Sequence, residues 1–422
     1  MTTLVVAELY PWPAVDGYRQ RLHHLIEGLT RTGPVDLVTI VRSGHPDPVE
    51  PPIPGVRNVL TVTSAGEAGI RDWLPAWTRG SIPRTGAVAL PRRLLSLDWS
   101  GVREQLPAWV ADDVDLVWYS HVDAWWPTHD LLAGRGQIVD FDNLENLALR
   151  LRRRIPPRFP PGAATPEKAS AVGRWALSRG FDLVDERRWD AIQRTCAALV
   201  DHVVVCSDLD AQRSGCPNAV VVPNGSDPVP TAIPDRRVLR GDRPTMLFVG
   251  ALDYEPNTEA VEWLVREVVP VIVDHRPDAV VRIVGRGSDA VSWVADHRGV
   301  ALVGPVDDLG PELLGADVSI VPIRVGAGTR LKVVEAMANH LPLVTTTVGC
   351  EGIDVVDGRS AMIRDDPRRF ADACLRLIDD GALRQRLADA GADLFAERYT
   401  WETIGTRVAE LGARTARSPE PG

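Results

Sequence analysis

The segment Gly326–Glu335 brings together residue types that suit the binding of an anion. It reads Gly-Ala-Gly-Thr-Arg-Leu-Lys-Val-Val-Glu and follows the apolar run Val318–Val321, so a tight turn should lead from a strand into a helix. Gly326 and Gly328 permit positive φ angles and let a ligand approach the backbone closely. Thr329 is a suitable N-cap, which would place the residues after it in the first helical turn.

Two cations in that first turn need an explanation. Arg330 and Lys332 would oppose the helix dipole there, at a cost of roughly 0.3–1 kcal/mol each. A bound diphosphate removes this conflict, because an Arg fork and a compact Lys charge at a helix N-terminus can hold its oxygens. Glu335 lies on the same helix face, and its carboxylate can accept hydrogen bonds from two ribose hydroxyls. The segment therefore predicts a nucleoside-diphosphate site. The alternative is that the helix starts with basic residues that are simply exposed to solvent.

Polar residues also follow strand-like runs in the first half of the chain. Asp142 comes directly after Ile138–Phe141, and it could either orient an acceptor hydroxyl or cap the next helix. His121 follows another such run and is either a general base or an ordinary polar loop residue. Asp140 and Asp142 have Asp-x-Asp spacing, but we expect no metal there, nor a metal site elsewhere.

The sequence Asp16-Gly-Tyr-Arg19 opens the first long helix-period stretch. Gly17 suits a tight turn beneath a ligand. Arg19 is either a surface residue or a further anion contact, and we favour the contact.

Short apolar runs alternate with helix-period stretches along the whole chain. The predicted strands are Leu4–Leu9, Val35–Val41, Val56–Val62, Val114–Tyr119, Ile138–Phe141, Val203–Cys206, Val220–Val222, Met246–Val249, Val280–Val284, Ala301–Val303, Val318–Val321 and Leu343–Thr346. The predicted helices are Tyr18–Thr30, Arg187–Val200, Thr258–Val273, Arg330–Asn339, Pro367–Asp379 and Leu383–Tyr399. Runs this apolar are typical of parallel α/β sheets that are covered on both faces.

The alternation is interrupted at Ser226–Pro244, which is rich in proline and charge and indicates a linker. We therefore predict two doubly wound Rossmann-like domains, residues 1–228 and 229–397, facing each other across a cleft. A helix at about 398–412 is expected to pack back onto the first domain. We predict an exposed, mobile loop at Ile155–Ser170 and disorder from about Ala413.

Composition excludes several classes of protein. The 422 residues carry a net charge of −10, whereas nucleic-acid binders are usually basic. The five cysteines show no CxxC pairing, which indicates free thiols. We see neither a signal peptide nor an apolar run of about 18 residues, and we expect a cytoplasmic protein with no integral membrane segment. Lysine is nearly absent, since only Lys168 and Lys332 occur.

Several motifs resemble those of family-4 glycosyltransferases, which have the GT-B fold and are typically retaining and metal-independent. The resemblance spans about Leu4 to Trp401. Besides Gly326–Glu335 and the Pro342–Ile353 stretch after it, it rests on Phe248–Asn257, Val222–Gly225, Asp140–Glu145 with Arg150, and Tyr10–Arg19.

The resemblance implies roles for particular residues. Arg330 and Lys332 would hold the diphosphate of a UDP-, GDP-, ADP- or TDP-sugar, and Glu335 the ribose. The backbone at Gly17 would face the diphosphate or the sugar, and Gly250 would let the nucleotide approach the sheet. No cofactor besides this donor substrate is implied.

The chain also departs from the family pattern. Many relatives carry a Glu that contacts the transferred sugar where this chain has Ala327, and many carry an Arg and a Lys within the stretch that corresponds to Leu252–Asn257. We therefore expect Arg330 and Lys332 to be the main phosphate-binding cations. Where relatives often have a His, this chain has Asp142 nearby.

The leading hypothesis is a glycosyltransferase that acts with retention of anomeric configuration. The acceptor would be a small molecule, a natural product or a lipid-linked hydroxyl; the 13 tryptophans are compatible with an aromatic acceptor or with ordinary core packing. The alternatives are a catalytically inactive GT-B partner subunit and a sugar-nucleotide epimerase. An epimerase needs paired acid and base groups, which the sequence does not supply; an inactive subunit could lose the phosphate-binding cations, which this chain retains.

Overall fold

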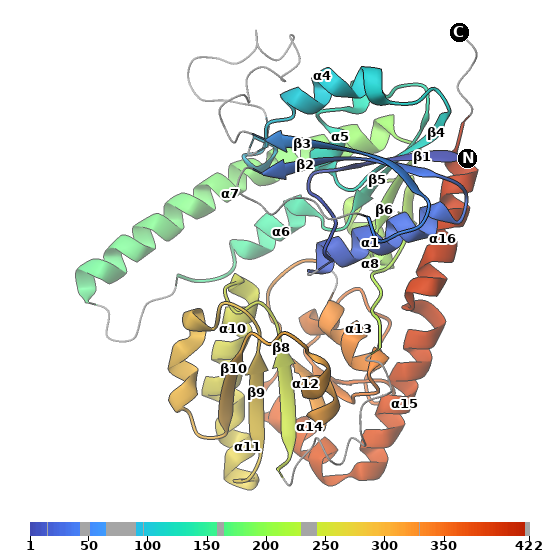
Figure 1. Cartoon of the computed structure of the whole chain (residues 1–422). Coiled ribbons are helices and arrows are strands. Elements are labelled where there is room, and N and C mark those ends of the chain that lie inside the picture. The colour runs from blue at the N-terminus through green and yellow to red at the C-terminus, as the bar shows by residue number, and fades with distance from the viewer. Residues whose placement is uncertain are drawn as a thin grey trace. The chain divides into compact units, whose positions relative to one another are not determined.

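The computed structural model describes residues 1–14, 16–42, 51–64, 90–95, 97–157, 164–228, 243–328 and 330–417 (Figure 1). The chain divides into two α/β units. Unit 1 comprises Met1–Pro223 and returns at Ile404, whereas unit 2 comprises Asn224–Thr403. Most of the predicted linker, residues 229–242, lies outside the described residues.

Unit 1 is built on a parallel sheet whose described strands have the order β3-β2-β1-β4-β5-β6-β7. The strands are β1 (Thr2–Ala7), β2 (Val35–Arg42), β3 (Val56–Ser64), β4 (Val114–Tyr119), β5 (Gly136–Phe141), β6 (His202–Val205) and β7 (Ala219–Val221). Each begins and ends within about two residues of its predicted run. The central strands are buried, which explains why apolar runs identified them.

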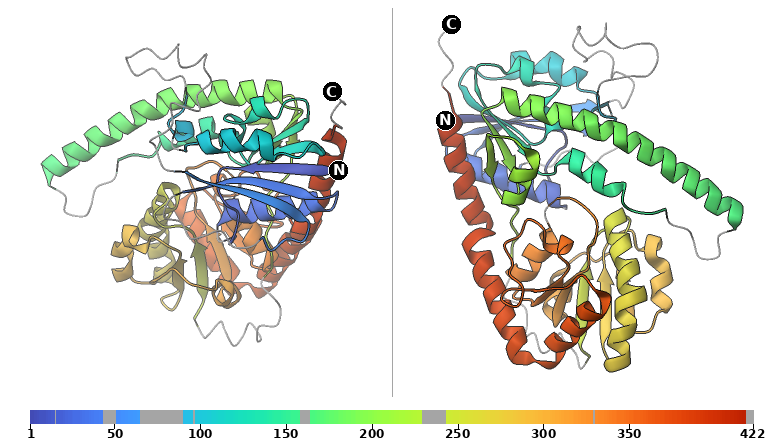
Figure 2. Two further views of the ribbon diagram at one scale, coloured as in Figure 1. Left: turned by 45° about the horizontal axis from the view of Figure 1, so that its top comes forward. Right: turned by 180° about the vertical axis from the view of Figure 1, so that it is seen from behind.

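Helices cover both faces of this sheet (Figure 2). They are α1 (Gly17–Thr30), α4 (Ser100–Trp109), α5 (Val122–Trp125), α6 (Glu145–Arg152), α7 (Thr165–Leu199), α8 (Asp208–Ser214) and α16 (Trp401–Thr415), with short 3₁₀ turns at Arg93–Leu95 and His129–Leu131. The fully buried tryptophans Trp99, Trp118 and Trp125 belong to the core of this unit, as ordinary packing predicts.

Two predictions for unit 1 were wrong. The loop expected at Ile155–Ser170 ends early, because α7 begins at Thr165, where Glu167 accepts a hydrogen bond from the Ala164 N–H at 3.0 Å. The disorder expected from about Ala413 does not begin there, because α16 continues to Thr415 and the Arg417 N–H donates to the Asp115 carbonyl at 3.0 Å.

Unit 2 contains a second parallel sheet, with described strands in the order β10-β9-β8-β11-β12-β13. The strands are β8 (Thr245–Val249), β9 (Val280–Val284), β10 (Val300–Gly304), β11 (Val318–Val321), β12 (Leu343–Thr345) and β13 (Met362–Ile363). Sequence analysis missed β13, because two residues are too short for an alternating pattern.

The helices of unit 2 are α10 (Glu255–Trp263), α11 (Val269–His275), α12 (Gly310–Gly315), α13 (Leu331–Ala338), α14 (Pro367–Asp379) and α15 (Gly381–Arg398), with 3₁₀ segments at Ser288–Asp296 and Val348–Cys350. The single helix predicted at Thr258–Val273 is instead α10, a π-helical segment at Leu264–Val268, and α11. Pro270 explains the change, since it lacks an N–H and cannot continue the hydrogen-bond ladder.

Both sheets are doubly wound. In each, the first strand lies inside the sheet, and the chain first adds strands on one side and then on the other. The direction reverses between β1 and β4 in unit 1 and between β8 and β11 in unit 2. Ligands of such sheets bind outside the carboxyl ends of the strands at this reversal, so the turns after these four strands are where a site is expected.

All five cysteines are free thiols, as their spacing predicted. Among the described residues, none of the helices combines the length and hydropathy that a bilayer crossing requires.

Candidate active site

The turn after β11 has the conformation that its glycines predicted. Gly326 and Gly328 have φ angles of 141° and 84°, which favour glycine. Thr329 lies outside the described residues. Helix α13 begins at Leu331, so Arg330 occupies the N-cap position instead of the first turn. This corrects the predicted start by one residue, while Lys332 remains in the first turn.

Arg330 is 8% exposed and organises this turn. Its guanidinium donates hydrogen bonds to the carbonyls of Gly326 at 2.9 Å, Ala327 at 3.0 Å and Val348 at 3.1 Å. Sequence analysis treated Arg330 as a phosphate ligand alone. The observed contacts show that it also holds the glycine turn against the segment after β12.

Lys332 is half-buried and lies beside the turn after β8. A Cβ placed on Gly250 would lie 3.0 Å from the Lys332 Nζ, and this Nζ is 5.7 Å from the centroid of the Phe248 ring. Among the described residues, the ammonium has no hydrogen-bond or ion-pair partner. Burial lowers the pKa of Lys332 to about 8, with Glu335 opposing the shift and Arg330 adding to it. Such an ammonium is a ready partner for an anion.

Glu335 lies one turn beyond Lys332 on α13 and is also half-buried. Its carboxylate has no hydrogen-bond or ion-pair partner within the described part of the chain. Burial raises the pKa of Glu335, and the charge of Lys332 opposes that shift. Lys332 therefore lies beside Gly250 and interacts with Glu335, and the donor site predicted from these residues stays a prediction.

A third turn joins this edge of the sheet, and sequence analysis missed it. Arg286, between Gly285 and Gly287, follows β9, and its carbonyl accepts the Leu252 N–H at 2.7 Å. A Cβ on Gly285 would lie 1.8 Å from the Gly250 carbonyl oxygen, so these turns touch. Arg286 is exposed. The Gly-x-Gly spacing after a predicted strand was the signal that could have identified it.

Unit 1 has a buried polar cluster at its own strand reversal. The Tyr18 hydroxyl donates to Glu8 Oε2 at 2.6 Å and also lies 2.8 Å from Ser120 Oγ, which donates to the same Glu8 oxygen at 2.6 Å. Burial and the charge of Glu8 raise the pKa of Tyr18 well above its ordinary value. This group could not be predicted from the sequence, because Glu8 stands within an apolar run.

His121 belongs to the same cluster and occupies the N-cap position of α5. It is 2% exposed, with its Nδ1 2.9 Å from Asp123 Oδ2 and its Nε2 3.8 Å from Glu145 Oε1. Burial disfavours the charged imidazole, but the charge of Asp123 and its hydrogen bond raise the pKa of His121 to about 9. An imidazolium cannot accept a proton, so this geometry favours a hydrogen-bond donor over the predicted general base.

Arg93 completes the cluster. Its Nη2 lies 2.8 Å from Asp123 Oδ2 and 3.9 Å from Glu8 Oε1, and its Nη1 pairs with Glu145. Glu8, His121 and Asp123 form one of the two groups of described residues that could hold a metal ion. The Arg93 guanidinium already supplies a positive charge to these carboxylates.

Asp142 does not cap α6, because the N-cap position of that helix is Leu144. The Asp142 Oδ1 lies 3.7 Å from Arg21 Nε and accepts the Cys206 thiol at 3.4 Å. Asp140 is bound by the same Arg21 through bonds of 2.7 and 2.9 Å and is buried. Burial raises the pKa of Asp140 to about 6 despite this pairing. Both aspartates contact Arg21, so its guanidinium already supplies a positive charge to their carboxylates.

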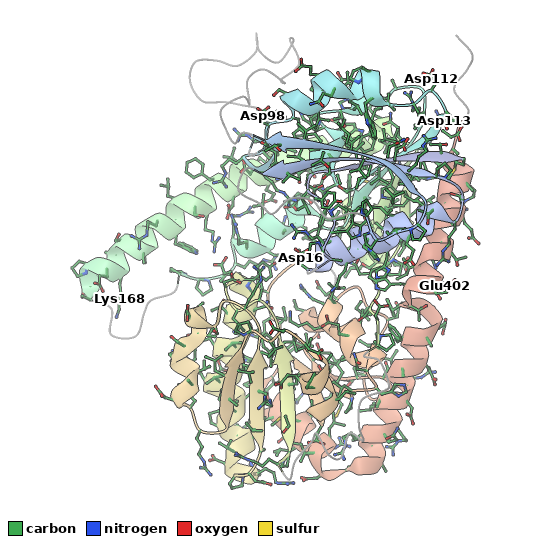
Figure 3. The ribbon with its side chains drawn as sticks, in the orientation of Figure 1. Asp16, Asp98, Asp112, Asp113, Lys168 and Glu402 are labelled. Carbon is green, nitrogen blue, oxygen red and sulfur yellow. The ribbon has the colours of Figure 1, made fainter. Side chains whose placement is uncertain are left out.

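Gly17 is the first residue of α1, and the preceding Asp16 caps the helix by accepting the Arg19 N–H at 2.9 Å (Figure 3). The Arg19 guanidinium pairs with Asp16 and donates to the Tyr10 carbonyl at 3.2 Å. In the structure Arg19 therefore holds the turn before α1, and the anion contact that we favoured is not needed to explain its position.

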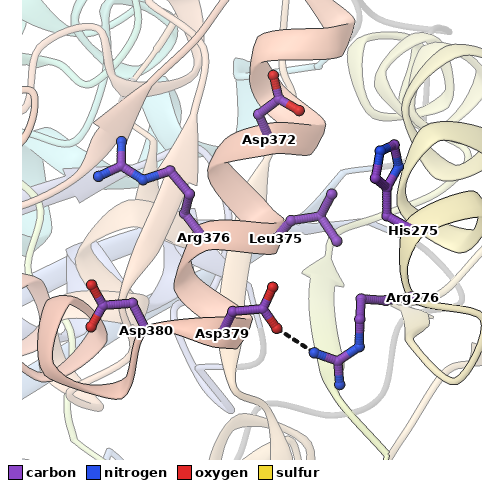
Figure 4. Close-up of a pocket in the computed structure, with 7 residues that line it drawn as sticks. All are labelled: His275, Arg276, Asp372, Leu375, Arg376, Asp379 and Asp380. Atoms are coloured by element: carbon purple, nitrogen blue, oxygen red, sulfur yellow. Dashed lines mark hydrogen bonds and ion pairs between the residues drawn. The ribbon is translucent and has the colours of Figure 1, made fainter.

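Unit 2 also has a pocket of about 630 Å³ that contains none of the predicted site residues (Figure 4). His275 and Arg276 at the end of α11, residues of α14 from Asp372 on, and Asp380 line it, with Arg276 bound to Asp379. Because helices of a doubly wound fold run against the strands, the ends of α11 and α14 lie toward the amino edge of the sheet. The pocket is therefore separate from the carboxyl-edge site.

Residues 243–380 match the family model described as glycosyl transferases group 1. The matched residues lie within unit 2. It is 25% identical to glycogen synthase from Mycobacterium tuberculosis, over 100% of this chain and 97% of that protein. It is 32% identical over 182 residues to D-inositol 3-phosphate glycosyltransferase from Corynebacterium diphtheriae, which covers 39% of this chain and 41% of that protein.

Solved structures show the same fold along nearly the whole chain. Sucrose-phosphate synthase from Thermosynechococcus elongatus has a TM-score of 0.64 at 19% identity and covers 98% of this chain and 99% of its own. Anabaena HepE in complex with UDP and glucose has a TM-score of 0.59 at 13% identity, covering 97% of this chain and 99% of its own. The predicted GT-B class, with two Rossmann-like domains, is confirmed.

Proposed function

We propose that this protein is a glycosyltransferase that moves a sugar from a nucleoside-diphosphate donor to an acceptor hydroxyl, with retention of configuration and without a metal ion. The observation that carries the proposal is the Lys332 ammonium. It is half-buried, has no polar partner among the described residues, and lies beside Gly250 at the strand reversal of unit 2. A buried charge is costly unless something pairs with it, and a donor diphosphate would do so.

Donor binding would use the residues of the two turns. Lys332 would hold the diphosphate directly. Arg330 would contribute its charge while it keeps the Gly326 turn in place, since a guanidinium has five donors and can bind carbonyls and phosphate together. Glu335 would accept hydrogen bonds from the ribose hydroxyls. Arg286 is exposed at the same edge and would supply a further cation, in place of those missing from Leu252–Asn257.

The chemistry follows from where negative charge develops. As the bond between the sugar and the diphosphate breaks, electrons move onto the leaving phosphate oxygen. Fixed cations at that position stabilise the transition state more than the ground state, which is the requirement for catalysis. Lys332 would contribute its positive charge, held beside the Gly250 turn.

Unit 1 would supply the acceptor side. Asp142 would orient the acceptor hydroxyl, and Gly17 would let the donor approach the start of α1. His121, held as an imidazolium by Asp123, would donate a hydrogen bond through Nε2, which has no hydrogen-bond partner among the described residues. The acceptor class remains the one that the sequence suggests: a small molecule, a natural product or a lipid-linked hydroxyl.

The proposal is tested by turnover. The protein is incubated with UDP-, GDP-, ADP- and TDP-sugars and an acceptor panel, and release of the nucleoside diphosphate is followed. UDP-glucose is the first donor to try, because HepE was solved with it. We expect release with at least one donor, unchanged rates in EDTA, and a product whose anomeric NMR signals match the donor configuration.

Other outcomes point to the alternatives. Interconversion of donor sugars without diphosphate release would identify an epimerase. Donor binding without turnover on any acceptor would identify an inactive partner subunit. Inversion at the anomeric carbon, or loss of activity in EDTA, would contradict the retaining or the metal-independent part of the proposal.

A further inference from the structure

The first two thirds of α7 expose an apolar face to solvent. Leu177 and Phe181 are 65% and 50% exposed, and Val172, Leu183 and Val184 are exposed as well. At about 100° per residue, these five side chains fall within one half of the helix circumference. We call these five residues the α7 outer face. Figure 2 shows α7 as a long helix whose first half extends beyond the sheet of unit 1.

The opposite face of α7 carries acidic residues that point into the protein. Asp182, Asp185 and Glu186 are all buried. Arginines neutralise each of them: Arg152 pairs with Asp182, Arg92 with Asp185 at 2.6 Å, and Arg150 with Glu186 at 2.8 Å. Up to Glu186 the helix thus turns acids inward and apolar residues outward, which reverses the pattern of an ordinary surface helix, whereas its last third buries Trp189, Ile192 and Cys196 in the usual way.

The segment of chain that carries the α7 outer face is basic. Residues 145–199, which include α6 and α7, contain eleven Arg or Lys and six Asp or Glu, a net charge of +5 in a chain whose total is −10. Arg174 and Arg187 are exposed on α7. Lys168 lies in its first turn (Figure 3). A half-face with apolar side chains and exposed arginines within and beside it fits a partner that has anionic headgroups above an apolar layer.

We propose that the α7 outer face docks on an anionic phospholipid membrane surface. A helix with this composition lies in the plane of the interface, with its apolar side chains below the headgroups and its cations among the phosphates. Each basic residue near an anionic leaflet strengthens the association by about fivefold. The inference is independent of the proposed enzymatic function.

A second copy of the chain is a poorer occupant of this face. Antiparallel pairing of two α7 helices about Phe181 would place Arg174 of one copy against Arg188 of the other, and Lys168 against Arg194. Like charges directly opposed across an interface cost affinity. Charge complementarity therefore favours the lipid surface.

Vesicle flotation of the full chain tests the proposal. Vesicles contain phosphatidylcholine alone or mixed with phosphatidylglycerol, at low and at high salt. The double variant Leu177→Ser/Phe181→Ser removes the two most exposed apolar side chains of the face, and Val356→Ser, at a residue that is 53% exposed in unit 2, is the matched control. We expect the wild type and V356S to float with anionic vesicles only, and the double variant to lose at least about tenfold of that binding.

A second variant separates charge from apolar burial. Arg174→Glu/Arg187→Glu keeps the apolar face, and we expect it to abolish the preference for anionic vesicles; circular dichroism checks that each variant is folded. Wild-type protein that does not float, or a double variant that floats like the wild type, overturns the proposal. A dimer seen by light scattering without vesicles, and lost in the L177S/F181S variant, would assign the face to a second copy instead.

Discussion

At the residue scale, Lys332 couples the pH of the solution to donor binding. Its pKa is lowered to about 8 in the free protein, so the ammonium loses its proton as the pH rises through that value. We expect the affinity for a nucleoside diphosphate to weaken progressively above about pH 8, because a neutral amine gives up the charge-assisted bond. Calorimetric titrations from about pH 7 to about pH 9.5 measure this slope.

The matched variant for this slope is Lys332→Arg. Arginine stays protonated throughout the range, so its affinity should vary less with pH even if its geometry binds less tightly. Equal slopes in the two proteins would show that Lys332 does not carry the pH dependence.

His121 and Asp123 make a second pH-dependent prediction, on stability. The pKa of His121 is about 9 in the folded chain and about 6.5 when unfolded, so the pair stabilises the fold fully below pH 6.5. This contribution is lost as the pH rises through about 9. We expect the unfolding temperature of the wild type to fall over that interval. Asp123→Asn, which removes the partner charge, should flatten the slope.

Scanning calorimetry at several pH values measures the effect, with Asp130→Asn as the control, because that carboxylate pairs with Arg103 and not with His121. An NMR titration of His121 that places its pKa near the ordinary value would contradict the assignment of an imidazolium, and the general-base interpretation would regain support.

At the element scale, the proposed site depends on how closely three turns meet. A Cβ on Gly250 would lie 2.9 Å from Asn257 Nδ2 and 3.0 Å from Lys332 Nζ, so Gly250→Ala crowds both side chains and fills the space beside the Gly250 backbone. We expect the variant to bind a nucleoside diphosphate about tenfold more weakly, the equivalent of one displaced charge-assisted bond, with little change in unfolding temperature. Isothermal calorimetry and thermal unfolding, run on the same sample, measure both.

Gly180→Ala is the control for this experiment. Gly180 lies in α7 with no neighbour within 4 Å of an added Cβ. It should leave the affinity unchanged and should not destabilise the protein, because alanine is the better helix former. If Gly250→Ala binds like the wild type, the nucleotide does not occupy the space beside Gly250.

Features that lie within a single strand or helix could be predicted from the sequence. Buried parallel strands are apolar throughout, so every described strand except the two-residue β13 was found. The glycines, Lys332 and Glu335 of the predicted donor segment lie within ten residues of one another, so one stretch of sequence predicts them together, and their role in donor binding stays a prediction. The part of α7 before Arg187 was missed, because its buried residues Asp182, Asp185 and Glu186 are acidic and pair with arginines, which conceals the usual apolar period.

Contacts between segments that are distant in the chain could not be predicted, because no local pattern encodes them. Glu8, Tyr18, Arg93 and His121 come from four separate parts of the chain, and only the folded sheet brings them together. The role of Arg330 in holding its own turn also depends on the Val348 carbonyl, which the sequence does not place nearby.

At the scale of the whole molecule, the chain leaves unit 1 at Pro223 and returns to it within α16. The return depends on a close approach of two helices in unit 1: a Cβ on Gly28 would lie 3.0 Å from Gly405 Cα and 3.1 Å from Val408 Cβ. We expect Gly28→Val to lower the free energy of unfolding by about 1–3 kcal/mol, because neither neighbour can give way easily.

Urea unfolding, followed by tryptophan fluorescence, measures this change, with Gly173→Ala on α7 as a control where nothing lies near an added Cβ. A Gly28→Val midpoint equal to that of the wild type would mean that α16 does not pack on α1 in solution.

The central claim is that Lys332 holds the diphosphate of a sugar donor. The most direct measurement is calorimetric titration of the full chain with UDP, GDP, ADP and TDP, comparing the wild type with Lys332→Met and Lys168→Met. Lys168, the other lysine of the chain, is exposed in the first turn of α7 and provides the matched control. We predict that at least one nucleotide binds the wild type and K168M equally, and K332M at least about tenfold more weakly. Binding that is unchanged in K332M, or no binding of any of the four, would contradict the claim.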